Sequence, residues 1–491
     1  MTYSVLSLLL AALSFAADAG AGSAATPLPL SACRLEHPMG LTVAAAECGS
    51  LSVAENPQDV TSRRIALQVA RVPAISRRKR PDPLFVLAGG PGMAASAFYA
   101  MAAPAFERIH RDRDIVLVDQ RGTGKSNALS CELNEDAFYR ATDAEIAAET
   151  RRCLKGLSTQ ANVAWYTTSI AVRDLDQVRA ALGYERINLY GVSYGTRVAQ
   201  HYLRRFPQRT RALILDGVVP TRLALGPATA LDAENALSNI LARCTREPDC
   251  RNRFGDPSVA YRNVRGALAA HAVAVSLADP TTGEPAHFEF TAYHLAAVLR
   301  LASYTPEQAA LLPLILHDAS EARDFAPLAA QFLLANRSYG EVIAYGMHNS
   351  VVCTEDVPFY DMKAVDRTRL EQTYLGAAQL DGLLTMCTIW PRGPIDADFH
   401  APLRSDVPVL LLSGTDDPVT PPGYAEQARG GFTHSLHVVL HGFGHGQLAA
   451  PCVDRVMAQF VERASVSGLD ISCVRNARPM PFFTSLNGPS P

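Results

Sequence analysis

The feature that most constrains the fold is a set of short, unbroken apolar runs separated by helical stretches. The runs occupy residues 84–87, 115–118, 187–190 and 212–215, and residues 170–182 repeat apolar side chains at helical spacing. A strand that faces water on one side alternates apolar and polar residues, whereas a strand covered on both faces is apolar throughout. Because these runs are interleaved with helices, the sequence predicts an α/β protein with a mostly parallel central sheet and helices on both faces.

The flanking segments suggest how this sheet begins and ends. Residues 51–53 and 65–72 alternate apolar with small or polar side chains, which predicts an opening antiparallel pair of strands. The segment 221–404 is mostly helical in pattern, and strand character returns at 407–412 and 436–440. One sheet interrupted by a large helical cap insertion explains this order, and a separate, independently acting domain is the alternative. The predicted units are a core segment at 22–220, the cap at 221–404 and a second core segment at 405–491.

The first 21 residues are typical of a secretory signal peptide. Residues 5–17 carry no charge, and residues 17–19 and 19–21 both have the A-x-A form of a cleavage site. We therefore expect an exported protein, secreted or periplasmic, with a disordered or weakly anchored tail as the alternative. No later segment reaches about 18 uninterrupted apolar residues, so no integral membrane segment is expected after signal removal. With 45 basic and 48 acidic side chains and no long run of one charge, nothing predicts a nucleic-acid partner.

Ten cysteines follow the signal, and in an exported protein this even number supports up to five disulfides. Spacing does not determine which cysteines pair. Along the chain they form five pairs of sequential neighbours: Cys33 with Cys48, Cys131 with Cys153, Cys244 with Cys250, Cys353 with Cys387, and Cys452 with Cys473. A zinc site is the alternative, but the chain has no Cys-x-x-Cys and its histidines are not clustered near the cysteines. We expect neither a metal nor a cofactor.

Ser193 lies within Gly-Val-Ser-Tyr-Gly, between an apolar run and a helical pattern that stops at Pro207. This is the sequence form of a nucleophile elbow, a sharp strand-to-helix turn. Gly191 and Gly195 suit such a turn because they lack the β-carbon that would clash with the neighbouring strand and helix. The turn would present the Ser193 hydroxyl above the sheet, at the positive end of the helix. We predict Ser193 as a nucleophile.

A serine hydroxyl needs a base to take its proton, and the base needs a group to orient it. Asp416 and Asp417 follow the predicted strand at 407–412, and His445 follows the next strand in a glycine-rich loop. We prefer Asp417 over Asp416, expected to be a turn or solvent residue, because a proline fixes the turn directly after Asp417. His445 is preferred over His441. The order Ser, Asp, His is that of the α/β-hydrolases.

Acyl transfer also needs donors for the negative charge that develops on the carbonyl oxygen. Gly89 and Gly90 follow the strand at 84–87, so this loop can present the Gly90 N–H, with the Tyr194 N–H as the second donor. A simple tight turn is the alternative. The nearby sequence Gly-Thr-Gly-Lys-Ser is similar to a phosphate loop, but the glycine that the pattern requires is Asp119 here. Nucleotide binding is therefore not expected.

Five segments together resemble the secreted tripeptidyl aminopeptidase and proline iminopeptidase group of α/β-hydrolases. They are Leu-Ala-Gly-Gly-Pro-Gly at 87–92, Asp-Gln-Arg-Gly-Thr-Gly at 119–124, Gly-Val-Ser-Tyr-Gly at 191–195, Gly-Thr-Asp-Asp-Pro-Val-Thr-Pro at 414–421 and Gly-Phe-Gly-His-Gly at 442–446. The resemblance implies Ser193, Asp417 and His445 as a triad and the release of residues or short peptides from free amino termini. Ala88 departs from the histidine that proline iminopeptidases commonly carry, which weakens a strictly proline-releasing assignment.

An exopeptidase must also hold the ammonium group of its substrate, which calls for carboxylates near the site. Glu355 and Asp356 are candidates, with Asp232 and Glu234 behind them, and a solvated or salt-bridged surface carboxylate is the alternative for each. The sequence therefore predicts an exported serine aminopeptidase acting on peptides. A carboxylesterase with the same triad and a non-catalytic binding protein of the same fold are the competing hypotheses.

Overall fold

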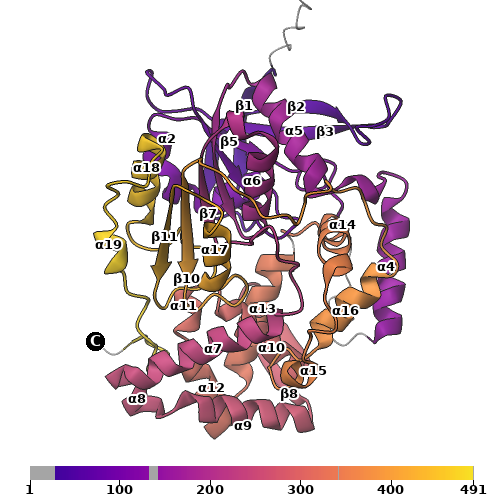
Figure 1. Cartoon of the computed structure of the whole chain (residues 1–491). Coiled ribbons are helices and arrows are strands. Elements are labelled where there is room, and N and C mark those ends of the chain that lie inside the picture. Colours follow the sequence, from indigo (N-terminus) through magenta and orange to yellow (C-terminus); the bar gives the residue numbers. More distant parts are fainter. Residues whose placement is uncertain (1–27, 132–141, 341, 490–491) are drawn as a thin grey trace, which may run out of the picture.

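The computed structural model describes residues 28–131, 142–340 and 342–489, without the side chains of 336–340. The predicted signal peptide lies outside the described residues. Within them, nine strands form one sheet in the order β1-β2-β3-β5-β4-β6-β7-β10-β11 (Figure 1). The strands are β1 (Ser31–Glu36), β2 (Val43–Ala54), β3 (Arg64–Val72), β4 (Leu84–Leu87), β5 (Ile115–Val118), β6 (Ile187–Val192), β7 (Thr210–Asp216), β10 (Val409–Gly414) and β11 (Ser435–Leu440).

The sheet has an antiparallel edge and a parallel centre. β1, β2 and β3 pair antiparallel, with Leu51 opposite Leu67, and β3 joins β5 in the same sense. From β5 through β4, β6, β7 and β10 to β11 every pairing is parallel. The predicted antiparallel pair and the mostly parallel sheet are confirmed, whereas β1 was not predicted.

Two hydrophobic cores cover the two faces of this sheet, and successive strand residues enter opposite cores. Phe85 and Leu87 of β4 lie in one core, whereas Leu84 and Val86 lie in the other. The first core takes helices α5, α6 and α17, and the second takes α1, α2 and α18. This two-sided burial is why the strands are apolar throughout. The helices of these layers are α1 (Ala95–Ala102), α2 (Glu107–His110), α4 (Asp143–Leu157), α5 (Thr168–Ala181), α6 (Tyr194–Arg205), α17 (Pro422–Arg429), α18 (Val453–Arg463) and α19 (Ser472–Arg475).

The segment between β7 and β10 forms a mostly helical body at the carboxyl end of the parallel strands, drawn at the bottom of Figure 1. It also contains an antiparallel hairpin of β8 and β9, which the sequence analysis did not predict. Its elements are α7 (Thr229–Arg246), α8 (Pro248–Phe254), α9 (Pro257–Ala270), β8 (Val273–Ala278), β9 (Pro285–Phe290), α10 (Ala292–Ala302), α11 (Pro306–Ala309), α12 (Leu312–Glu321), α13 (Ala326–Gly340), α14 (Tyr345–Glu355), α15 (Arg367–Glu371) and α16 (Ala378–Cys387).

This segment packs in two places. Helices α7 to α10, α12 and α13 surround a core of their own. In contrast, α14 and α16 lie beside α4 (Figure 1), and Val351, Cys353 and Cys387 join the core beneath α5 and α6. The later part of the segment therefore returns to the sheet before β10 begins.

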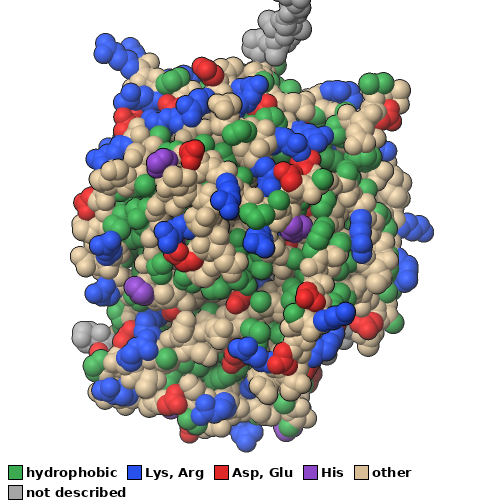
Figure 2. Space-filling model, in the orientation of Figure 1, with side chains coloured by type: hydrophobic (Ala, Val, Ile, Leu, Met, Phe, Trp, Pro, Cys, Tyr) green, Lys and Arg blue, Asp and Glu red, His purple; other side chains and the backbone are tan. Residues whose placement is uncertain are grey.

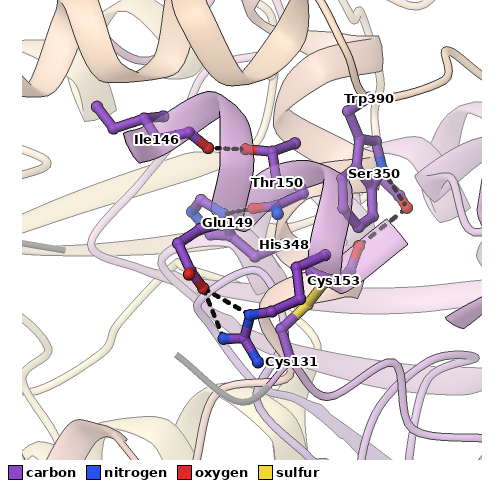
Figure 3. The surroundings of a disulfide bond; sticks show 11 residues. Cys131, Ile146, Glu149, Thr150, Cys153, His348, Ser350 and Trp390 are labelled. Carbon is purple, nitrogen blue, oxygen red and sulfur yellow. Dashed lines mark hydrogen bonds and ion pairs between the residues drawn. A yellow bond between two sulfur atoms is a disulfide. The ribbon is translucent and has the colours of Figure 1, made fainter. Parts of the chain in front are cut away.

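Five disulfides join the five pairs of cysteines that are sequential neighbours along the chain. Cys353–Cys387 links α14 to α16, and Cys131–Cys153 ties the chain after β5 to α4. Figure 3 shows the latter bond near Trp390, whose indole N–H donates to Ser350 at 3.1 Å. One disulfide therefore restrains α4 relative to the chain after β5, and the other restrains α16 relative to α14.

The surface carries both charges. On the face drawn in Figure 2, basic and acidic side chains are interspersed, in line with the nearly equal totals in the sequence. A search of the described residues finds no helix with the length and apolar character needed to span a membrane.

Candidate active site

Ser193 occupies a strained turn between β6 and α6. Its backbone has φ 55° and ψ −125°, a conformation that a residue with a side chain rarely adopts. A Cβ on Gly191 would lie 2.3 Å from the Gly195 carbonyl oxygen, and one on Gly195 would lie 2.3 Å from that of Leu87. Strand, turn and helix are thus pressed together at the positions where the sequence places glycine, which gives the elbow its shape.

Asp417 and His445 meet at the carboxyl end of the same sheet. The His445 Nδ1 lies 2.9 Å from Asp417 Oδ2 and 3.0 Å from Oδ1. Asp417 is only 1% exposed, and it also accepts hydrogen bonds from the backbone N–H groups of Val419 and Thr420, both at 2.8 Å. The Thr420 hydroxyl donates to Oδ2 at 2.7 Å. The carboxylate is therefore held in one orientation facing the imidazole.

The electrostatics of this pair suit a base and the group that orients it. Burial disfavours the charge on Asp417, but His445 and Thr420 outweigh burial and hold the pKa of this carboxyl below its ordinary value. Burial also disfavours charge on His445, yet the Asp417 carboxylate raises the pKa of the imidazole above its ordinary value. A carboxylate facing Nδ1 keeps the proton on that nitrogen, which leaves Nε2 as the acceptor.

Asp416 and His441, the alternatives that the sequence offered, are not part of this pair. Asp416 is buried, accepts a hydrogen bond from the Thr415 hydroxyl at 2.9 Å, and has a pKa raised by burial. Asp416 was expected to be a turn or solvent residue; it does lie in a turn, but that turn folds its side chain inward, away from solvent. His441 is exposed at the end of β11. Of the two aspartates, Asp417 is the one that the structure joins to His445.

The glycine-rich loop after β4 lies against the elbow. A Cβ on Gly89 would be 3.1 Å from Ser193 Cβ and 3.7 Å from its hydroxyl oxygen, and Gly90 has φ +108°. Tyr194 is the first residue of α6, where backbone N–H groups have no acceptor within the helix. The loop and the helix start therefore flank the Ser193 hydroxyl, as a pair of oxyanion donors requires.

Two of the four carboxylates proposed for substrate binding lie in the core instead. Asp356 accepts from both terminal nitrogens of Arg197, at 2.7 and 3.1 Å. Glu355 accepts from the Thr168 N–H at 2.7 Å and from its hydroxyl at 2.8 Å, and burial raises the pKa of Glu355 to about 7. Both are fully buried behind the elbow helix. Both were candidates for binding the substrate ammonium; the structure gives them internal hydrogen-bond partners, and a role in substrate binding stays a prediction.

The other two carboxylates differ from each other. Glu234 accepts from the Tyr261 hydroxyl and from the Tyr374 N–H, so it has structural partners within the cap. Asp232, on the first turn of α7, accepts from the Tyr424 hydroxyl at 2.6 Å. Burial raises the pKa of Asp232 to about 6, and the negative charge of Asp417 adds to the rise. Asp232 is therefore the candidate that lies close enough to Asp417 for the two charges to interact.

Three residues at this site were not singled out from the sequence: Asp216, Tyr304 and Thr420. The Tyr304 carbonyl accepts the His445 N–H at 2.8 Å, and its ring lies edge-on to the imidazole with centroids 5.0 Å apart. Tyr304 comes from the cap, so no local pattern could link it to His445. Asp216 could have been singled out from the sequence, because it is a single carboxylate directly after the apolar run 212–215 and so at the end of a predicted strand.

The sheet order, the elbow after β6 and the carboxylate and imidazole after β10 and β11 define an α/β-hydrolase. The sequence agrees: residues 82–246 match the family described as alpha/beta hydrolase fold, and residues 372–473 match the one described as TAP-like protein. The chain belongs to the α/β-hydrolases and is a serine hydrolase. Its relatives include serine peptidases.

Among curated relatives, the serine protease Hip1 of Mycobacterium tuberculosis is 27% identical over 433 residues, covering 80% of this chain and 81% of the relative. The tripeptidyl aminopeptidase of Streptomyces coelicolor is 24% identical over 465 residues, covering 89% and 84%. Carboxylesterase B of M. tuberculosis is 29% identical over 419 residues, covering 77% and 76%. A solved proline iminopeptidase from Mycobacterium smegmatis has a TM-score of 0.42 and 17% identity, covering 85% of this chain and 98% of that one.

Proposed function

We propose that the protein is an exported serine aminopeptidase that releases amino acids or short peptides, such as tripeptides, from free amino termini. The observation that carries this proposal is the buried Asp417 carboxylate hydrogen-bonded to His445 at the sheet edge where Ser193 occupies its strained turn. The names of the Hip1 and tripeptidyl aminopeptidase relatives support a peptide substrate. Five disulfides are consistent with an exported protein.

In this proposal Ser193 and His445 act in two half-reactions. The Ser193 oxygen attacks the scissile carbonyl carbon while His445 Nε2 takes the hydroxyl proton, and Asp417 stabilises the imidazolium. The N–H groups of Gly90 and Tyr194 bind the oxyanion. The imidazolium then gives its proton to the leaving amine, which departs and leaves an acyl-enzyme. A water molecule, deprotonated by His445, hydrolyses the ester and restores Ser193.

Asp232 is our candidate for holding the substrate ammonium. It lies on the cap helix α7, is partly buried, and bonds to Tyr424 through one carboxylate oxygen. Its pKa of about 6 keeps the group ionised at neutral pH, so it can pair with a protonated amine. A hydrogen bond to a charged group is worth about 1.5–3 kcal/mol, which is roughly ten- to hundred-fold in kcat/KM.

The test compares chromogenic peptide substrates with free and N-acetylated amino termini. For the parent enzyme we expect acetylation to lower kcat/KM by roughly ten- to hundred-fold. Asp232→Asn should lose most of that preference, whereas Asp249→Asn, an exposed position on α8, should keep it. An enzyme that cleaves both substrates equally well is not an aminopeptidase, and Ser193→Ala should abolish cleavage of both.

A carboxylesterase is the second candidate, because Carboxylesterase B is a relative of similar identity and coverage. Ester and amide hydrolysis pass through the same acyl-enzyme, so the proposed triad serves both. Simple ester substrates without an amino group separate the two. An esterase would hydrolyse them faster than any free peptide, and Asp232→Asn would leave that rate unchanged.

A further inference from the structure

Asp216 is a completely buried carboxylate at the last position of β7. Its side chain accepts a hydrogen bond from the Tyr190 hydroxyl at 2.8 Å and from the Gln447 N–H at 2.8 and 3.0 Å. Its own carbonyl oxygen accepts the Ser193 N–H at 2.9 Å. One residue is therefore bonded to the elbow, to the strand that carries the elbow, and to the loop that carries His445.

We propose that Asp216 is a positioning residue, which holds the His445 loop against the strand and elbow that present Ser193. The inference rests on the proposed function, because it assigns Asp216 a role in aligning the proposed triad. Asp216 acts through its hydrogen bonds and its charge, and it takes no part in the proton transfers.

The His445 loop is held at both ends, and Asp216 provides one of the two anchors. At one end the cap contributes the Tyr304 carbonyl, which accepts the His445 N–H at 2.8 Å. At the other end Asp216 accepts the N–H of Gln447, two residues after His445. Gly446 between them has φ +81°, so the chain turns sharply there. Without the Asp216 acceptor, the buried Gln447 N–H loses its partner and this end of the loop is released.

The charges around His445 give Asp216 a second, measurable effect. The largest charge effects on the imidazole come from Asp417 after β10, Asp216 on β7, and Arg300 on α10. Burial lowers the pKa of His445, the two carboxylates raise it, Arg300 lowers it, and the net shift is upward. Burial raises the pKa of Asp216 itself to about 6, against the Gln447 and Tyr190 hydrogen bonds, so it is ionised at neutral pH. Removing its charge should therefore lower the pKa of His445.

The experiment measures the rate at which a fluorophosphonate labels Ser193 as a function of pH, with intact-protein mass as the readout. Asp216→Ala removes the acceptor of the Gln447 N–H, so we expect it to slow labelling by roughly ten- to hundred-fold, because the base is displaced. Asp216→Asn keeps an amide oxygen as acceptor and removes the negative charge. The acid limb of its pH profile should move to lower pH by roughly one unit, because a negative charge beside His445 is gone. A purely structural role would lower stability without moving the acid limb.

The matched control is Asp82→Asn, another buried carboxylate, at the opposite end of the sheet before β4. Its acid limb should coincide with that of the parent. If Asp216→Asn does not fold, Tyr190→Phe removes one donor to the Asp216 carboxylate and should move the acid limb by a smaller amount in the same direction.

The outcomes separate the two proposals. A parent protein whose Ser193 is not labelled contradicts the proposed function and this inference with it. A labelled parent whose acid limb is matched by that of Asp216→Asn, or by that of Tyr190→Phe where Asp216→Asn does not fold, overturns the role of Asp216 alone. A folded Asp216→Ala that is labelled as fast as the parent does the same.

Discussion

Replacing Asp417 by asparagine should inactivate the enzyme through the tautomer of His445. The Asp417 Oδ1 accepts the N–H groups of Val419 and Thr420, both at 2.8 Å. In Asp417→Asn these two donors hold the amide oxygen at the Oδ1 position, so the amide NH₂ takes the place of Oδ2. That position lies 2.9 Å from His445 Nδ1. The NH₂ would then donate to Nδ1, and the proton of the neutral imidazole would move to Nε2.

An imidazole protonated on Nε2 cannot take the proton of Ser193. The aspartate-to-asparagine change at the equivalent position of another serine hydrolase lowers kcat by about 10⁴-fold, which corresponds to about 5 kcal/mol of barrier. We expect a loss of the same order here. The volume and most hydrogen bonds at position 417 are preserved, so the melting temperature should change little compared with the activity.

The assay is steady-state hydrolysis of a chromogenic peptide, with Asp416→Asn as the matched control at the adjacent position. Asp416 bonds to Thr415 and has no bond to His445, so its variant should stay within roughly ten-fold of the parent. The reasoning is refuted if Asp417→Asn also stays within that range, or if the two variants lose activity equally.

Three further predictions follow from the same geometry. Gly195→Ala should lower the free energy of unfolding by about 1–3 kcal/mol in denaturant titration, because its Cβ would lie 2.3 Å from the Leu87 carbonyl oxygen. Gly156→Ala, in helix α4 with open space around it, should be neutral or stabilising, because alanine favours a helix more than glycine does. Equal free energies of unfolding for the two variants would contradict the packing argument. The acid limb of kcat/KM should lie above about pH 6.5, since His445 must be neutral to act as a base and its pKa is raised; a limb below pH 6 would contradict the pairing with Asp417. Each of the five disulfides that is reduced should lower the free energy of unfolding by about 2–4 kcal/mol, and an unchanged melting temperature after reduction would show that the bonds contribute nothing.

The parts of the fold that the sequence predicted well are those set by local patterns. Buried strands such as β4 and β5 are apolar throughout because both faces are covered, and the elbow at Ser193 is encoded by two glycines and the strand before them. The order of Asp417 and His445 after successive strands predicted their meeting, because parallel strands end at one edge of the sheet.

The parts that were missed depend on contacts between distant segments. Asp356 pairs with Arg197 across 159 residues, and nothing near either residue in the sequence marks them as partners. The same is true of the bond from Asp216 to Gln447, 231 residues apart. The β8 and β9 hairpin has weak alternation within a largely helical segment. The unit boundaries at 220 and 404 stay a prediction, since the later cap helices pack against the core.

If catalysis proceeds through an acyl-enzyme on Ser193, rapid quenching should trap that intermediate. The parent enzyme would be mixed with a peptide p-nitrophenyl ester that has a free amino terminus, because the fast acylation by an activated ester lets the acyl-enzyme accumulate. The mixture would be quenched with acid within milliseconds and analysed by intact mass and peptide mapping. We predict a mass increase equal to the acyl portion of the substrate, located on Ser193 and missing from Ser193→Ala. Turnover without any covalent adduct, or an adduct on another residue, would contradict it.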